Sequence, residues 1–130
     1  MSKELEQNNR NSFSIFVHFV WVVSIAFVAY FSLSPDVELP FEFKQSDKLY
    51  HFLAYLWLAG IPFLGFQSLK VAVAGALLML PFGIGLEYAQ GLTVGRFFSI
   101  ADMIANGIGV LLGVSLGRYL KLRFFASSQP

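Results

Sequence analysis

The sequence lacks cysteine and carries little charge, and both shortages limit the kind of protein it encodes. None of its 130 residues is Cys, which excludes disulfide bonds and thiolate metal sites. Charged residues make up 13% of the chain, whereas they make up about 25% of soluble domains. The formal net charge of +1 offers no excess of positive charge for nucleic acid. We therefore expect no nucleic-acid partner.

Apolar residues, by contrast, are abundant. Hydrophobic residues account for 56% of the chain, and 15 of them are Phe. A chain of this length has too small an interior to bury so many apolar side chains away from water. A bilayer as solvent removes this difficulty, which indicates an integral membrane protein with lipid as its main partner.

Four apolar stretches predict an all-α transmembrane bundle of four helices. The first covers residues 13–33, which at about 1.5 Å per residue is long enough to cross the hydrocarbon core. A cleaved signal peptide is the alternative, but this stretch is longer than a typical signal. The other three stretches are residues 47–66, 71–92 and 100–120. Pro62 and Pro81 fall inside two of them, where we expect kinks.

The flanking and connecting segments predict the topology. Residues 1–12 and 121–130 are interpreted as cytoplasmic tails around a membrane domain of residues 13–120. Six of the nine Lys and Arg residues lie on the side of the tails, and three lie on the other side. The six are Lys3, Arg10, Lys70, Arg118, Lys121 and Arg123, and the three are Lys44, Lys48 and Arg96. The positive-inside rule therefore places both termini in the cytoplasm.

Small and polar residues repeat along one face of each of the last three predicted helices. In residues 100–120 this face begins at Asp102 and continues in steps of three and four residues. Small residues at such a spacing allow helix backbones to approach closely in a membrane. The residues assigned to helix packing are Gly83, Gly109, Gly113 and Gly117. The first helix has no such face and is expected at the periphery.

Polar residues that are unusual in a bilayer gather towards one membrane face, which the topology makes the extracytoplasmic one. They open the second and fourth helices, close the third, and occupy the turn between the third and fourth. Glu87 is expected about one turn inside the bilayer, where an unpaired carboxylate costs several kcal/mol. Arg96 is the expected bidentate partner of one acid. The candidate ligand-binding residues are Asp47, Lys48, His51, Tyr55, Glu87, Gln90, Arg96, Asp102 and Asn106.

Some of these residues also have a purely structural explanation. Asp102 follows Ser99 at the spacing of a capping box, and an acid suits the first turn of a helix. The same explanation applies to Asp47. Glu87 lacks it, because the last turn of a helix is unfavourable for an acid. Together with His51 these acids are suitable types for a divalent metal, but their spacing matches no known signature, so we expect no metal and no cofactor.

The polar residues also occur in an order that resembles the VanZ-like family. The stretches that carry the resemblance are SDKLYHFLAY at 46–55 and GLEYAQGLTVGRFFSIADMIANGIGVLLG at 85–113. They contain D-K-x-x-H-x-x-x-Y, E-x-x-Q, G-R and D-x-x-x-N-x-x-G-x-x-x-G in the family's order, within a core motif of residues 46–118. The resemblance implies a bacterial inner-membrane protein with a role in the cell envelope or in low-level resistance to the lipoglycopeptide teicoplanin.

Three interpretations of function stay open. The preferred one is a polar pocket that binds a lipid-linked envelope amphiphile, such as a lipid-linked glycan, or a lipoglycopeptide. The first alternative is an intramembrane acid–base enzyme acting on a lipid headgroup, with His51, Glu87 and Asp102 as its catalytic candidates. The second is a structural membrane subunit, and a homo-oligomer is compatible with each interpretation. The VanZ-like family has no established catalytic activity, so we favour a non-enzymatic role.

Overall fold

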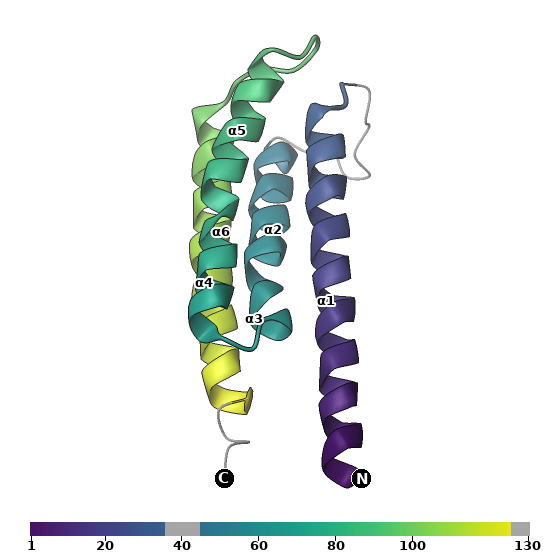
Figure 1. Cartoon of the computed structure of the whole chain (residues 1–130). Coiled ribbons are helices and arrows are strands. Elements are labelled where there is room, and N and C mark those ends of the chain that lie inside the picture. Colours follow the sequence, from purple (N-terminus) through teal and green to yellow (C-terminus); the bar gives the residue numbers. More distant parts are fainter. Residues whose placement is uncertain (36–44, 126–130) are drawn as a thin grey trace.

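The computed structural model describes residues 1–35 and 45–125, and its regular elements are all helical. They are α1 (Ser2–Leu33), α2 (Ser46–Gly60), α3 (Pro62–Gly65), α4 (Leu69–Leu77), α5 (Met79–Gly91), α6 (Ile100–Leu120) and a π-helical turn, η1 (Lys121–Phe125). Figure 1 shows four antiparallel columns, formed by α1, by α2 with α3, by α4 with α5, and by α6. The predicted all-α fold of four helices is confirmed. The side of the membrane that each end of the bundle faces stays a prediction.

Three of the columns contain helices long and apolar enough to cross a membrane. These helices are Lys3–Leu33, Leu69–Gly91 and Ile100–Phe124. They correspond to the first, third and fourth predicted stretches, which makes a multi-pass membrane protein plausible. The second predicted stretch differs, because its α2 has 15 residues and its α3 has 4.

Two prolines explain where the helical columns are interrupted. Pro62 has no backbone N–H to donate to the preceding turn, and the break between α2 and α3 falls at the adjacent Ile61. Ile61 keeps right-handed helical dihedrals, so the chain continues in nearly the same direction. Pro81 lies near the start of α5, and the break between α4 and α5 falls at Leu78, three residues earlier. Both interruptions fall within one turn of the prolines at which the sequence predicts kinks, and the kinks themselves stay a prediction.

The first helix begins earlier than the apolar pattern suggested. Residues 1–12 were expected to form a tail, yet α1 starts at Ser2. This segment contains Lys, Glu and Gln, which favour helices, and Glu4 lies in the first turn, where an acid suits the helix dipole. The most apolar window of α1 is 6% buried, against 33% for the other two long helices. The peripheral position expected for this helix is therefore observed.

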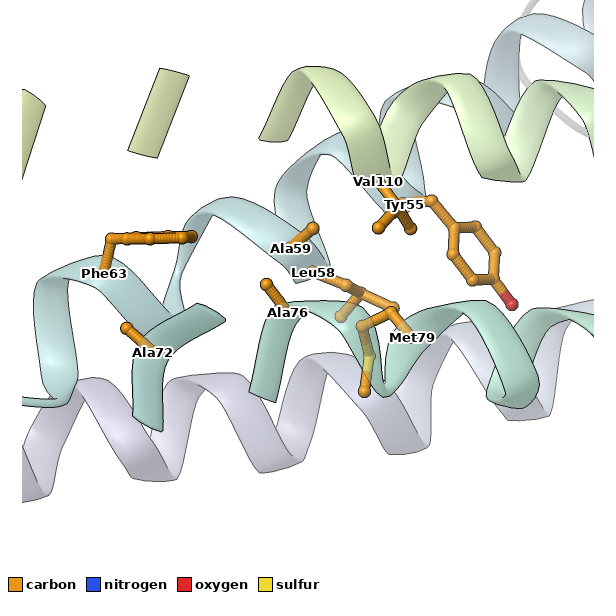
Figure 2. Packing of buried hydrophobic residues seen from close by; sticks show 8 residues of the cluster. All are labelled: Tyr55, Leu58, Ala59, Phe63, Ala72, Ala76, Met79 and Val110. Carbon is orange, nitrogen blue, oxygen red and sulfur yellow. The ribbon is translucent and has the colours of Figure 1, made fainter. Parts of the chain in front are cut away.

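The hydrophobic core is formed by residues of α2, α3, α4, α5 and α6. Figure 2 shows its eight residues, which are Tyr55, Leu58, Ala59, Phe63, Ala72, Ala76, Met79 and Val110. The two alanines of α4, Ala72 and Ala76, lie near Phe63 of α3 and Leu58 of α2 in Figure 2, and their small side chains leave room for these larger ones. This core holds α2 in the centre of the bundle and thereby fixes the positions of the polar residues at its N-terminal end.

Glycines bring α2 and α6 into direct backbone contact. A Cβ atom added at Gly109 would lie 2.5 Å from the carbonyl oxygen of Phe52, and one added at Gly113 would lie 2.8 Å from that of Leu56. Real Cβ atoms do not come so close to backbone atoms, so these two positions require glycine. One turn later, a Cβ at Gly117 would overlap the ring of Phe63.

Candidate functional site

Three ionisable side chains from three helices meet where α2 and α6 begin and α5 ends. They are His51 of α2, Glu87 of α5 and Asp102 of α6, and we call them the acid–imidazole cluster. One ring nitrogen and two carboxylate oxygens, one from each residue, all lie within 4.8 Å of one another. Glu87 is 1% exposed and Asp102 is 8% exposed. These are the three residues that the sequence analysis proposed as catalytic candidates.

Glu87 is anchored through only one of its two oxygens. Its Oε1 accepts a hydrogen bond of 2.6 Å from the backbone N–H of Ser99. Ser99 is the N-cap of α6, and its own hydroxyl accepts a hydrogen bond of 3.2 Å from the N–H of Asp102. The other carboxylate oxygen, Oε2, is buried and has no hydrogen-bond partner among the described residues. Glu87 thus joins α5 to the start of α6 and keeps one acceptor available.

Asp102 lies near two side-chain nitrogen atoms, one of His51 and one of Lys48. Its Oδ2 lies 3.9 Å from Nε2 of His51, and its Oδ1 lies 3.9 Å from Nζ of Lys48. Both distances exceed that of a hydrogen bond, so the contacts are electrostatic only. Within the described residues Oδ1 is buried without a hydrogen-bond partner. The side chain of Lys48 is 38% exposed, which places it at the rim of the cluster.

The ring of His51 is oriented by Asn106. Nδ1 of the imidazole lies 3.0 Å from Oδ1 of Asn106. A carbonyl oxygen can only accept, so Nδ1 carries the proton and donates it. The opposite nitrogen, Nε2, is the one that faces Asp102. Asn106 thereby selects the tautomer and directs a nitrogen lone pair, in the neutral ring, towards a carboxylate.

Tyr55 adds a third polar group without a partner. Its side chain is 1% exposed, and within the described residues its hydroxyl makes no hydrogen bond. Figure 2 shows the ring reaching from α2 with its oxygen directed at the neighbouring helix. A Cβ at Gly83 of α5 would lie 3.0 Å from this oxygen, so the absence of a side chain there makes room for it. Glu87 follows Gly83 by one helical turn.

Gln90 and Arg96 donate hydrogen bonds to the end of α1. The guanidinium of Arg96 donates to the carbonyl oxygens of Phe31 and Ser34, with a shortest distance of 2.6 Å. The side-chain amide of Gln90 donates to the carbonyl of Ser32 at 2.9 Å. The last carbonyls of a helix lack partners in their own helix and attract positive charge. These two residues therefore cap the end of α1, in place of the Arg96–carboxylate pair that the sequence suggested.

The remaining candidate, Asp47, lies outside the cluster. It occupies the first turn of α2 and is exposed. The structure thus divides the nine candidates into three groups. Lys48, His51, Tyr55, Glu87, Asp102 and Asn106 belong to or border the cluster, Gln90 and Arg96 cap α1, and Asp47 faces outward.

The sequence did not predict one contact of the site, a hydrogen bond donated by a backbone N–H. The amide of Ser99 supplies the only hydrogen bond that the described residues give to the buried Glu87 carboxylate. The capping-box spacing of Ser99 and Asp102 did point to a helix start there. Nothing in that spacing indicated that the acid bonded to this amide would come from another helix.

An apolar groove of about 430 Å³ lies along α2, α3 and α6. Its lining residues are Leu53, Leu56, Trp57, Gly60, Ile61, Phe63, Leu64, Gly113, Leu116, Gly117, Leu120 and Lys121. At one end of the groove, Nζ of Lys121 donates to the carbonyls of Phe63 and Phe66, at 3.2 and 2.6 Å. Apart from Lys121, the residues that line the groove are apolar.

Comparison with known proteins gives no matching family model, no matching curated protein and no matching solved structure. The resemblance noted in the sequence therefore depends on the ordered motif residues alone.

Proposed function

We propose that the chain is a VanZ-like integral protein of the bacterial inner membrane whose acid–imidazole cluster binds the polar headgroup of an envelope amphiphile. The amphiphile is a lipid-linked glycan or a lipoglycopeptide. The observation that carries the proposal is the convergence of three ionisable side chains from three helices to within 4.8 Å. Ionisable groups among apolar helices are costly, and membrane proteins keep them where they serve function.

The chemistry of the cluster suits a headgroup that offers both hydroxyl groups and negative charge. Oε2 of Glu87 and Oδ1 of Asp102 are buried acceptors that sugar hydroxyls or amides can satisfy. Lys48 at the rim supplies a positive charge for a phosphate or carboxylate. Arg96 has no headgroup role in this proposal, because its guanidinium already binds the carbonyls of α1.

The proposal requires the cluster to face the cell exterior, as the distribution of Lys and Arg predicts. The chain has no Cys, so single cysteines can be labelled without background. Val94 lies in the turn between α5 and α6 and is 90% exposed. We expect Val94→Cys to react with an impermeant maleimide in intact cells. Lys70→Cys, at an exposed position in the first turn of α4 at the opposite end of the bundle, should react only after permeabilisation. The reverse pattern would put the cluster out of reach of an envelope ligand.

Native mass spectrometry of protein taken from its own membrane tests ligand binding directly. We expect the wild-type chain to retain a lipid-linked ligand that Glu87→Gln and Asp102→Asn lose. Asp47→Asn is the matched control, because it removes the same charge from an exposed position on the same end of the bundle. Equal retention by all four proteins would overturn the proposal.

Teicoplanin tolerance separates the two roles that the family resemblance suggests. Expression in a teicoplanin-susceptible bacterium should raise tolerance if the ligand is a lipoglycopeptide, and Glu87→Gln should abolish the gain. Unchanged tolerance, combined with a retained lipid-linked glycan, assigns the protein to envelope biosynthesis instead.

An intramembrane acid–base enzyme is the second candidate, and the same 4.8 Å convergence favours it. Nε2 of His51 lies 3.9 Å from Oδ2 of Asp102, which places a candidate base beside a candidate acid. Turnover of lipid extracts by the purified protein, lost in His51→Gln, would support this candidate. Absence of turnover across undecaprenyl-linked and phospholipid substrates would leave binding as the function.

A further inference from the structure

The three side chains of the cluster meet in one small volume, and each of its two acids has one buried oxygen without a hydrogen-bond partner within the described residues. Two carboxylates and one imidazole lie within 4.8 Å of one another, and Oε2 of the 1% exposed Glu87 makes no hydrogen bond within the described residues. Buried polar atoms are rarely left without a partner. Two adjacent carboxylates in an apolar bundle also repel each other unless one of them is protonated or a positive charge lies between them.

The orientation of His51 is that of a metal ligand. Histidines that bind metals donate a hydrogen bond from the second ring nitrogen to a neighbouring acceptor, which orients the ring. Nδ1 of His51 donates to Asn106 in this way at 3.0 Å. Nε2 is left facing Oδ2 of Asp102 at 3.9 Å, which is too long for a hydrogen bond and close to the spacing of two ligands of one ion.

We propose that His51, Glu87 and Asp102 bind one divalent first-row transition-metal ion, such as Mn²⁺ or Zn²⁺. One imidazole and two carboxylates suit these ions, and the set neutralises their charge. Ligand atoms around such an ion are about 3.0–3.5 Å apart, so the three side chains need to close by roughly 1 Å. The expectation of no metal came from spacing along the chain, which does not reveal how three helices meet.

Three protein ligands leave further positions on the ion for water or for an anionic oxygen. A phosphate-bearing lipid headgroup supplies such an oxygen, and Lys48 at the rim carries a second positive charge for it. The metal site rests on the proposed function, because the ion would occupy the headgroup site. It specifies phosphate as the part of the headgroup that the protein recognises.

The experiment is a titration of chelator-treated protein in nanodiscs with Mn²⁺ alone, followed by electron paramagnetic resonance of the free ion. We expect one Mn²⁺ per chain, with affinity at least about 100-fold weaker in His51→Gln, Glu87→Gln and Asp102→Asn than in the wild type. Asp47→Asn should bind within about twofold of the wild type, since Asp47 is exposed and outside the cluster. Zn²⁺ should displace the bound Mn²⁺.

A second measurement does not depend on any variant keeping its fold. Electron spin-echo modulation of Mn²⁺ bound to the wild-type chain should show coupling to an imidazole nitrogen. Binding no greater than that of empty nanodiscs, equal binding by Asp102→Asn and Asp47→Asn, or bound Mn²⁺ without nitrogen coupling would each overturn the metal site.

Failure of this inference is distinguishable from failure of the proposed function. A wild-type protein that retains its lipid-linked ligand but binds no Mn²⁺ overturns only the metal site. A protein that binds Mn²⁺ through the three residues but retains no such ligand supports the metal site and overturns headgroup binding.

Discussion

The backbone N–H of Ser99 donates a 2.6 Å hydrogen bond to the carboxylate of Glu87, although the two residues belong to different helical columns. In a capping box the acid three residues after the N-cap accepts this bond. Here Ser99 does accept from the N–H of Asp102, as the motif requires, but the acid that bonds back is Glu87 of α5. The carboxylate of Asp102 is therefore free of a capping role and lies in the cluster instead.

Removing this acceptor should weaken the start of α6. Glu87→Ala leaves the part-buried N–H of Ser99 without its partner, which costs about 1–3 kcal/mol. Glu87→Gln keeps an acceptor oxygen and should recover much of that loss. Unfolding of the purified protein in mixed micelles measures both changes.

Glu4→Ala provides the control, because Glu4 is an exposed acid in the first turn of α1. A Glu87→Ala protein as stable as Glu4→Ala would show that the bond to Ser99 contributes nothing to the fold.

Two glycines of α6 should respond differently to substitution by alanine, because only one of them contacts α2. Gly109→Ala forces a methyl group into the carbonyl of Phe52 and should destabilise the bundle by about 1–3 kcal/mol. Gly107→Ala meets nothing within 4 Å and should be neutral or stabilising by up to about 1 kcal/mol, because alanine favours helices. Thermal unfolding in detergent compares the two variants. An equal gain in stability in both variants would mean that helix propensity, not close packing, governs these positions.

In its neutral form, each of the two histidines should adopt the less common tautomer, with the proton on Nδ1. Nδ1 of His51 faces Oδ1 of Asn106, and Nδ1 of His18 lies 2.6 Å from the carbonyl oxygen of Ser14. Neither oxygen can donate, so each ring must. Nitrogen-15 NMR of histidine-labelled protein measures the tautomers, which the chain makes simple by having only two histidines.

Asn106→Leu removes the acceptor from one ring only. His51 should then lose its preference for the Nδ1–H form, whereas His18 should keep it and act as the internal control. If both rings respond, or if His51 shows the Nε2–H form in the wild type, the described orientation of His51 is wrong.

The helical architecture was readable from the sequence because it depends on local patterns. The apolar stretch 100–120 matches α6 residue for residue, since Ser99 supplies a clear N-cap. Pro62 and Pro81 indicated where the columns break, because a missing N–H acts within one turn. The start of α1 was misjudged, because polarity was interpreted as a tail although the residues favour helix.

The candidate site was predictable as a gathering of residues but not as a set of contacts. Antiparallel helices brought His51, Glu87 and Asp102 to one end of the bundle, as the pattern indicated. Which groups pair depends on rotations and tilts of the helices that no spacing encodes. Arg96 illustrates this, because the open carbonyls at the end of α1 compete with carboxylates for its guanidinium.

Arg96 caps the end of α1 with three hydrogen bonds. Its Nε and Nη2 atoms both donate to the carbonyl of Ser34, and Nη2 also reaches that of Phe31. Arg96→Gln cannot span these acceptors, so the end of α1 should open more often. Hydrogen–deuterium exchange should rise about tenfold or more in residues 30–34, which corresponds to roughly 1.4 kcal/mol, while the middle of α1 stays protected.

Two further variants separate capping from charge in this prediction. Arg96→Lys keeps the charge but loses the planar fork, so it should restore only part of the protection. Arg118→Gln removes an exposed charge in the last turn of α6 and should leave residues 30–34 unchanged. If the amides of residues 30–34 stay fully protected from exchange in Arg96→Gln, Arg96 does not cap α1. The role first expected for Arg96, as a partner of the acids, would then require that the same variant retains less of the lipid-linked ligand.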